Sequence, residues 1–162
     1  MSKEAIQAAV VDTSVFADYY FIYPRKPERH ERARIILNKL SSLGLPVYEP
    51  FLFEVELRAL LVRRIKPKQV LKIVSITLEH VNLVREELIH DRAAEIALLT
   101  GCRAVDAYYI ATAKHASAAL ITNDKVMRNN ALKTGIEAYY LLNVNDYNKL
   151  INKLKPVDME TL

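Results

Sequence analysis

The sequence predicts an α/β protein with three layers, in which a central and mostly parallel β-sheet is flanked by helices. Short apolar runs alternate along the chain with longer amphipathic stretches, which is the pattern of strands alternating with helices in a parallel sheet. Two of the apolar runs end in an aspartate, at Asp12 and Asp124. A chain of 162 residues with 51% hydrophobic residues is long enough for one domain with its own core.

In the first half of the chain, small and β-branched residues at 7–11 predict a buried strand. Asp12, Thr13 and Ser14 follow it, and all three residue types favour the start of a helix. Prolines and Gly44 mark the ends of the next predicted helices, because proline breaks a helix and glycine commonly ends one. The predicted elements are then helices over 14–20 and 28–43, a strand at 47–48, and helices over 51–65 and 68–77.

The second half continues the same alternation. Gly101 and Gly135 each follow a helical stretch, as expected of helix ends. We expect one domain over residues 1–155 and a polar tail over 156–162. The predicted elements are a strand over 81–84, helices over 85–100 and 103–115, a strand over 120–122, a helix over 124–133, a strand over 138–142 and a helix over 146–155.

Composition excludes several classes of protein. A single cysteine, Cys102, rules out an internal disulfide framework and a cysteine-rich zinc site. No apolar run is long enough to cross a bilayer, and the N-terminus lacks a signal-peptide pattern, so a cytoplasmic location without membrane contact is expected. The net charge of +4 and the pI near 9.1 suit a protein that meets a polyanion.

Four acidic residues lie in apolar surroundings rather than in solvated charge runs. Asp12 and Asp124 close strands, and Glu56 and Asp106 lie in mostly apolar helices. A carboxylate in such a place must be paired, protonated or bound to a metal, because burial of an isolated charge is costly. Ligands of parallel sheets gather at the carboxyl ends of the strands. If all four carboxylates meet there, a divalent cation is needed to hold them together, which indicates metal-dependent phosphodiester chemistry.

Four segments in this order resemble the motifs of PIN-domain ribonucleases, particularly the VapC-type toxins. The first is Val-Val-Asp-Thr-Ser-Val-Phe at 10–16, and the second is Phe-Glu-Val-Glu-Leu-Arg-Ala-Leu-Leu at 53–61. The third begins with Arg-Ala-Val-Asp-Ala at 103–107 and continues with Tyr-Ile-Ala-Thr-Ala at 109–113, and the fourth is Ile-Thr-Asn-Asp at 121–124. The resemblance covers residues 8–145 and implies a PIN-like fold.

The resemblance also implies an endoribonuclease that uses Mg²⁺ or Mn²⁺ to hydrolyse RNA phosphodiester bonds. A small antitoxin protein and a second copy of the chain are the implied partners. We expect Asp12 and Asp106 to contact the metal most directly, with Glu56 and Asp124 completing the shell through water or at a second ion. The supporting residues are Ser14, Thr122 and Arg103, which can orient a carboxylate, a water or a phosphate.

Other interpretations stay open from the sequence alone. Glu54 is the alternative second acid, although Glu56 fits the motif better. Asp12 and Asp124 can be helix N-caps, and Arg103 can simply pair with Asp106; Glu56 can pair with Arg58 or Arg63. The alternative functions are a PIN nuclease of RNA maturation or decay without an antitoxin, and a non-catalytic module that binds RNA or protein.

Two basic clusters can guide RNA toward the carboxylates or can be ordinary solvated helix faces. Aromatic residues beside the first cluster can belong to the core, to a dimer contact or to an inhibitor-binding surface. The first cluster contains Arg25, Lys26, Arg29, Arg32 and Arg34, the second contains Arg58, Arg63, Arg64, Lys66 and Lys68, and the aromatic residues are Tyr19, Tyr20, Phe21 and Tyr23.

Overall fold

The structure is a computed structural model, and it describes residues 5–156 of the chain. All pairings between its strands are parallel: β1 with β4, β4 with β5, and β2 with β3. A parallel bridge between Ala9 and Val47 joins the two groups, which gives the spatial order β3-β2-β1-β4-β5. The strands are β1 (Ala9–Val11), β2 (Tyr48–Pro50), β3 (Asn82–Val84), β4 (Ala119–Thr122) and β5 (Ala138–Tyr140).

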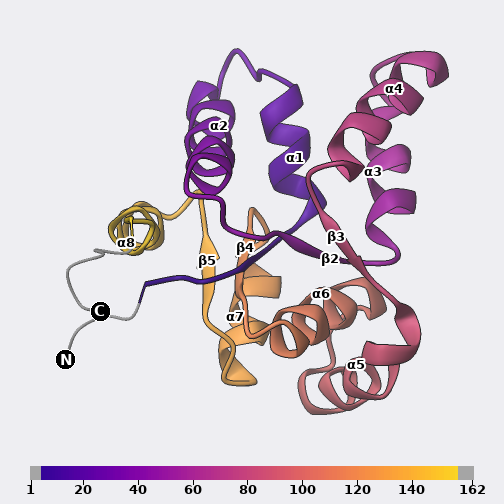
Figure 1. Ribbon diagram of the computed structural model, residues 1–162, viewed down its shortest axis with the longest axis vertical. Coiled ribbons are helices and arrows are strands. Elements are labelled where there is room, and N and C mark those ends of the chain that lie inside the picture. The colour runs from indigo at the N-terminus through magenta and orange to yellow at the C-terminus, as the bar shows by residue number, and fades with distance from the viewer. Residues whose placement is uncertain (1–4, 157–162) are drawn as a thin grey trace.

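Helices cover the sheet, with α1 and α2 on one side of the strands and α5 and α6 on the other (Figure 1). The predicted α/β class and its mostly parallel central sheet are therefore confirmed. The helices are α1 (Thr13–Tyr20), α2 (Pro27–Ser42), α3 (Phe53–Leu61), α4 (Pro67–Leu78), α5 (Glu86–Thr100), α6 (Ala104–His115), α7 (Lys125–Lys133) and α8 (Val144–Lys153).

The core fixes the helices that carry the acidic residues. Strands β1 and β4 are buried along their whole length, as their mostly apolar sequences suggest. Phe16 of α1 meets Phe53 of α3 edge to face, with ring centroids 5.2 Å apart and planes at 70°. Such pairs add about 0.5–1.5 kcal/mol beyond their buried area. The contact holds the start of α3 against α1, which directly follows β1.

Each predicted strand and helix is present, and the differences lie at the ends. The helix predicted over 51–65 is shorter, because a turn over 62–65 separates Leu61 from the helix that begins at Pro67. Strand β2 extends beyond the predicted 47–48 to Pro50. Helix α8 starts two residues early, since the Asn143 side chain accepts the backbone N–H of Asp146 at 3.0 Å and caps it.

The predicted C-terminal tail and the predicted domain boundary both depend on residues beyond the described range of 5–156. The predicted tail over 156–162 lies, except for Pro156, outside this range. The division into a domain over 1–155 and a tail stays a prediction. Within residues 5–156, none of the helices has the length and apolar character required to span a bilayer.

Candidate functional site

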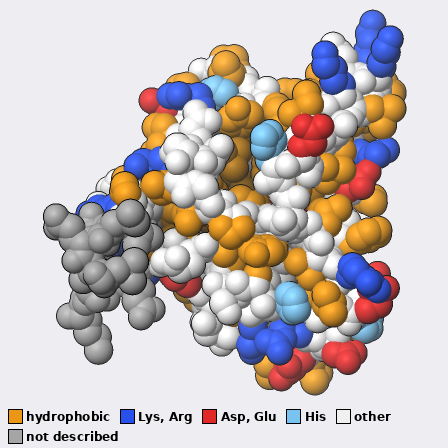
Figure 2. Space-filling model, in the orientation of Figure 1, with side chains coloured by type: hydrophobic (Ala, Val, Ile, Leu, Met, Phe, Trp, Pro, Cys, Tyr) orange, Lys and Arg blue, Asp and Glu red, His pale blue; other side chains and the backbone are white. Residues whose placement is uncertain are grey.

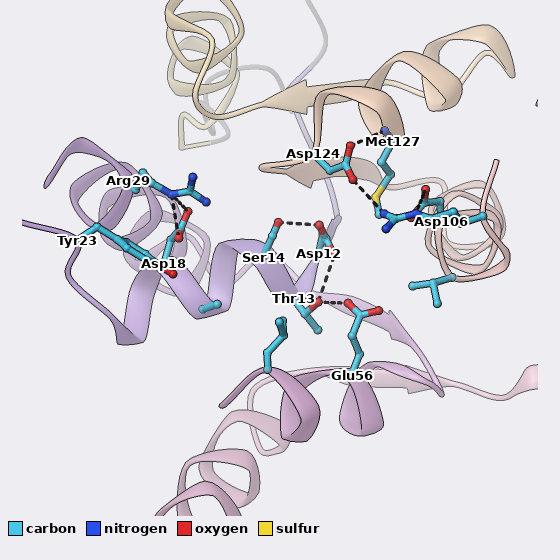
Figure 3. A pocket seen from close by; sticks show the side chains of 14 residues that line it. Asp12, Thr13, Ser14, Asp18, Tyr23, Arg29, Glu56, Asp106, Asp124 and Met127 are labelled. Carbon is cyan, nitrogen blue, oxygen red and sulfur yellow. Dashed lines mark hydrogen bonds and ion pairs between the residues drawn. The ribbon is translucent and has the colours of Figure 1, made fainter. Parts of the chain in front are cut away.

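A pocket of about 370 Å³ brings all four predicted acidic residues together, although they come from four separate parts of the chain (Figure 3). Asp12 follows β1, Glu56 lies on α3, Asp106 lies on α6, and Asp124 precedes α7. Since β1 and β4 are adjacent and parallel, the residues that follow them emerge at the same edge of the sheet. Ser14 and Arg103 also line the pocket.

Hydroxyl groups surround the carboxylate of Asp12, which is only 4% exposed. Ser14 Oγ donates to Asp12 Oδ2 at 2.6 Å, and Thr122 Oγ1 donates to the same oxygen at 2.9 Å. The backbone N–H groups of the next residues, at 123 and 124, donate to these two hydroxyl oxygens at 3.1 and 2.9 Å. Each hydroxyl oxygen thus accepts a hydrogen bond from a backbone N–H and donates its own proton to Asp12.

The Asp12 side chain is therefore not the cap of α1, because its oxygens are engaged by hydroxyls rather than by the first N–H groups of the helix. Burial raises the pKa of the Asp12 carboxyl, and the hydrogen bonds from Ser14, Thr122 and Thr13 lower it in part. Among residues 5–156 no cationic side chain pairs with Asp12, and a buried carboxylate that is held by donors but lacks such a partner is suited to bind a cation.

Glu56 points into the pocket and Glu54 does not. Glu56 Oε1 accepts hydrogen bonds from the Thr13 hydroxyl and, at 3.4 Å, from the Tyr109 hydroxyl. Glu54 pairs instead with Arg58 one helical turn away and lines none of this pocket. Burial raises the pKa of Glu56, and the nearby Asp12 charge raises it further. Glu56 therefore shares the electrostatic environment of Asp12, whereas Glu54 belongs to a surface ion pair.

Arg103 joins the other two acids. Its Nη2 donates to Asp106 Oδ1 and to Asp124 Oδ2, both at 3.0 Å, while its side chain is 72% exposed. Asp124 also caps α7, because its Oδ1 accepts the N–H groups of Val126 and Met127 at 2.8 and 3.1 Å. The cap and the i,i+3 ion pair considered from the sequence are thus both present. Together they engage both oxygens of each carboxylate, since Arg103 Nε also donates to Asp106 Oδ2 at 3.1 Å. A metal ion would therefore share these oxygens with Arg103 or displace its guanidinium.

The sequence interpretation missed Glu49, a fully buried carboxyl on β2. Its Oε1 accepts the backbone N–H of Val11 at 3.0 Å, and its Oε2 has no hydrogen-bond partner among the described residues. Burial raises its pKa well above the ordinary value, and the charges of Asp12 and Glu56 raise it further. The signal was available, because Glu49 follows an apolar run in the same way as Asp12 does.

A second missed group lies on the far side of the pocket. Asp18 is 1% exposed and accepts Arg29 Nε at 3.1 and 3.0 Å on its two oxygens. Asn123, the residue before Asp124, also donates to Asp18. Figure 3 shows Asp18, Arg29 and Tyr23 together at one end of the pocket, away from Asp106 and Asp124. Nothing in the sequence marked Asp18, since it lies inside a short helix without a strand end.

The donors fit Mg²⁺ or Mn²⁺ in kind, because the acidic side of the pocket offers carboxylate and hydroxyl oxygens. Within residues 5–156, however, no three His, Cys, Asp or Glu side chains lie close enough to share one ion. The Arg103 guanidinium lies between Asp106 and Asp124 and offsets the repulsion between these two carboxylates. Mg²⁺ usually takes one or two carboxylates and keeps several waters, so this spacing suits a hydrated ion.

Comparison with known proteins places the chain in a family. The PIN domain model matches residues 9–133, which include all four acidic residues. The chain belongs to the PIN domain family. PIN domains are generally nucleases, and PIN nucleases generally use divalent metals. The resemblance inferred from the four motifs is therefore confirmed at the level of the family.

Solved structures agree with this PIN fold. VapBC-1 from nontypeable Haemophilus influenzae is 17% identical, with a TM-score of 0.64, over 84% of this chain and 99% of that one. FitAcB from Neisseria gonorrhoeae is 22% identical, with a TM-score of 0.58, over 80% and 95%. A protein from Pyrobaculum aerophilum is 15% identical, with a TM-score of 0.59, over 90% and 94%. At these identities the likeness concerns the fold alone. No curated protein has a sequence that matches this chain significantly.

Proposed function

We propose that this PIN protein is an endoribonuclease that uses Mg²⁺ or Mn²⁺ to hydrolyse RNA phosphodiester bonds. The observation that carries the proposal is the single pocket lined by Asp12, Glu56, Asp106 and Asp124 at the carboxyl ends of parallel strands. The nuclease activity general to PIN domains and their use of divalent metals support it. The pI near 9.1 suits a polyanionic substrate.

In this proposal Asp12 and Asp106 hold the metal most directly, and Glu56 and Asp124 complete its shell through water or at a second ion. A bound divalent ion would supply an activated water and stabilise negative charge on the phosphate. The chain's own groups prepare the site. The hydroxyls of Ser14 and Thr122 hold the Asp12 carboxylate in place, and the exposed Arg103 orients two carboxylates and can contact a phosphate.

Cleavage of a labelled single-stranded RNA tests this function. Purified wild type, Asp12→Asn and Asp106→Asn are compared with Mg²⁺, with Mn²⁺ and with EDTA. We expect metal-dependent cleavage by wild type and a loss of at least about 100-fold in both variants, because each removes a charge that positions the ion. Glu54→Gln is the control, since it also removes one carboxylate charge but at a residue outside the pocket. Undiminished cleavage by both aspartate variants would contradict the proposal.

We also propose that the enzyme is the toxin of a VapBC-type pair and is inhibited by a small antitoxin. The VapBC-1 and FitAcB structures that share its fold are toxin–antitoxin proteins, which supports this role. Induced production of wild type in a host without the antitoxin is expected to stop growth, whereas the Asp12→Asn variant is tolerated. Normal growth with active wild-type enzyme would contradict the toxin role and favour a nuclease of RNA maturation or decay.

A homodimer is the third part of the proposal. Phe51, Val55 and Val62 are 59%, 67% and 48% exposed, and Val55 and Val62 are seven residues apart, so they share a face of α3 and its end. Exposed apolar groups on one face favour a protein contact. Sedimentation analysis is expected to give twice the chain mass for wild type and a monomer for Val55→Lys. A monomeric wild type at every concentration would contradict this assembly.

A further inference from the structure

Two aromatic rings and two arginines meet at the end of the pocket opposite Asp106 and Asp124. The Arg64 guanidinium carbon lies 4.6 Å from the ring centroid of Tyr23 and 5.2 Å from that of Phe21. The Arg29 guanidinium carbon lies 5.3 Å from the Tyr23 centroid. We call this group the aromatic–arginine bracket, and its members are Phe21, Tyr23, Arg29 and Arg64.

The bracket joins parts of the chain that are distant in sequence. Phe21 and Tyr23 follow α1, Arg29 is in the first turn of α2, and Arg64 lies in the turn between α3 and α4. Figure 2 shows Lys and Arg side chains at the end of the molecule where α3 and α4 meet. Tyr23 and Arg29 also line the carboxylate pocket, so the bracket forms part of its rim.

The arginines of the bracket are held in place but keep donors available. Arg29 uses its Nε for Asp18, and no hydrogen bond from its two terminal nitrogens occurs within the described part of the chain. Arg64 is exposed, and no carboxylate among residues 5–156 pairs with it. Arg58, by contrast, already pairs with Glu54. Stacking on aromatic rings fixes the plane of a guanidinium at a low cost in entropy, which leaves its N–H groups directed at an anion.

We propose that the aromatic–arginine bracket binds a backbone phosphate of single-stranded RNA, a short stretch of nucleotides away from the bond that is cut. Planar guanidinium groups match phosphate oxygens in geometry as well as charge. The distance follows from α1, whose eight residues separate Asp12 from the bracket by about 12 Å. This inference rests on the proposed function, because it takes RNA as the substrate. It adds the direction in which the RNA strand extends from the carboxylates toward the bracket.

Binding without metal tests the bracket separately from catalysis. A labelled single-stranded RNA is titrated in EDTA against wild type, Arg64→Gln, Arg64→Lys and Arg63→Gln. We expect Arg64→Gln to weaken binding and to reduce the slope of log K against log salt by about 0.7, the value for one phosphate contact with a single strand. Arg64→Lys should lie between it and wild type, because lysine keeps the charge and loses the planar stack. Arg63→Gln is the matched control, since Arg63 is an exposed neighbour outside the bracket.

A scan with neutral methylphosphonate linkages, one at a time, identifies the phosphate. One linkage should weaken binding to wild type as much as Arg64→Gln does, and should have no further effect on that variant. Every other linkage should affect both proteins equally. Such coupling at one linkage supports phosphate binding by the bracket even if wild type cleaves no RNA with any metal. In that case only the nuclease function is refuted.

Two outcomes overturn the bracket. Equal losses for Arg64→Gln and Arg63→Gln, with no coupled linkage, would show diffuse attraction by the basic surface. Displacement of RNA by polyglutamate, again without a coupled linkage, would show a surface for acidic proteins. Both leave the nuclease proposal standing if wild type cleaves RNA with metal.

Discussion

Glu49 and Asp12 show how single buried carboxyls give this pocket its character. Asp12 is surrounded by hydroxyl donors, which partly offset the effect of burial on its pKa. Glu49 has one backbone donor and, among residues 5–156, no partner for its second oxygen, and burial raises its pKa well above the ordinary value. Glu49 lies on β2 and Asp12 follows the neighbouring strand β1, yet the surroundings of Asp12 favour a negative charge and those of Glu49 favour the protonated carboxyl.

The raised pKa of Glu49 predicts how stability depends on pH. Between the ordinary pKa of a glutamate and its raised value in the folded protein, the folded state keeps a proton that the unfolded state releases. Stability contributed by Glu49 is therefore lost as pH rises through this window. Glu49→Gln removes the ionisation and keeps an oxygen for the Val11 N–H. Its melting temperature should exceed that of wild type at pH 8 by about 2–4 °C or more.

Thermal melts in EDTA at pH 8 and pH 4.5 measure this difference, which should shrink at the lower pH. Glu54→Gln, which alters a partly exposed ion pair, serves as the control and should change little at either pH. A wild type as stable as Glu49→Gln at pH 8 would contradict the assignment of a protonated Glu49.

Arg103 is a cation at the place where we propose that a metal ion binds. Because its guanidinium bridges Asp106 and Asp124, it neutralises part of the charge that attracts the ion. Arg103→Gln should therefore tighten Mn²⁺ binding roughly three- to tenfold, as expected for removing one nearby, solvent-screened charge. Calorimetric titration measures this, with Arg85→Gln as an exposed control that pairs with Glu87. Weaker Mn²⁺ binding by Arg103→Gln would contradict this expectation and would mean that the orienting effect of Arg103 on the two carboxylates outweighs its charge.

Among the elements, the turn between β4 and α7 contains a side chain with two roles, that of Asp124. Asp124 caps α7 with Oδ1 and faces the pocket with Oδ2. Asp124→Asn keeps an oxygen for the cap and loses the charge, whereas Asp124→Ala loses both. Alanine should lower stability by about 1 kcal/mol, and asparagine by much less. Both variants should weaken Mn²⁺ binding by about tenfold or more, as loss of a ligand partner typically does.

Melting curves and Mn²⁺ titrations of the two Asp124 variants separate these tasks. If Asp124→Asn binds Mn²⁺ as wild type does, the residue is a helix cap and nothing more. If both variants melt like wild type, the cap contributes little to the stability of α7.

Element positions follow from local signals, which is why the sequence predicted them. Apolar runs, prolines and helix-ending glycines mark the strands and helices, and Gly101 indeed closes α5 with a φ of 65°. The positions of Asp12 and Asp124 could also be predicted, because both residues follow parallel strands. The ends were less certain: Pro50 still belongs to β2, and Asn143 moves the start of α8 through its side chain.

Contacts between distant segments could not be predicted in this way. The sequence placed Arg64 and Tyr23 in two unrelated groups, and only the fold stacks one on the other. The sequence also did not decide between Glu54 and Glu56. The packing of α3 against α1 decides it, because it directs Glu56 into the pocket. Such contacts depend on three-dimensional packing, which residue spacing along one chain does not encode.

For the whole molecule, we propose that the folded chain assembles one divalent-metal site from four separated segments. An ion that binds the folded state alone also stabilises it. Calorimetric titration of Mn²⁺ into wild type, Asp106→Asn and Glu54→Gln tests this most directly. We expect binding by wild type and Glu54→Gln, and a loss of about 10- to 100-fold in affinity for Asp106→Asn. Absence of binding by wild type, or equal binding by all three proteins, would contradict it.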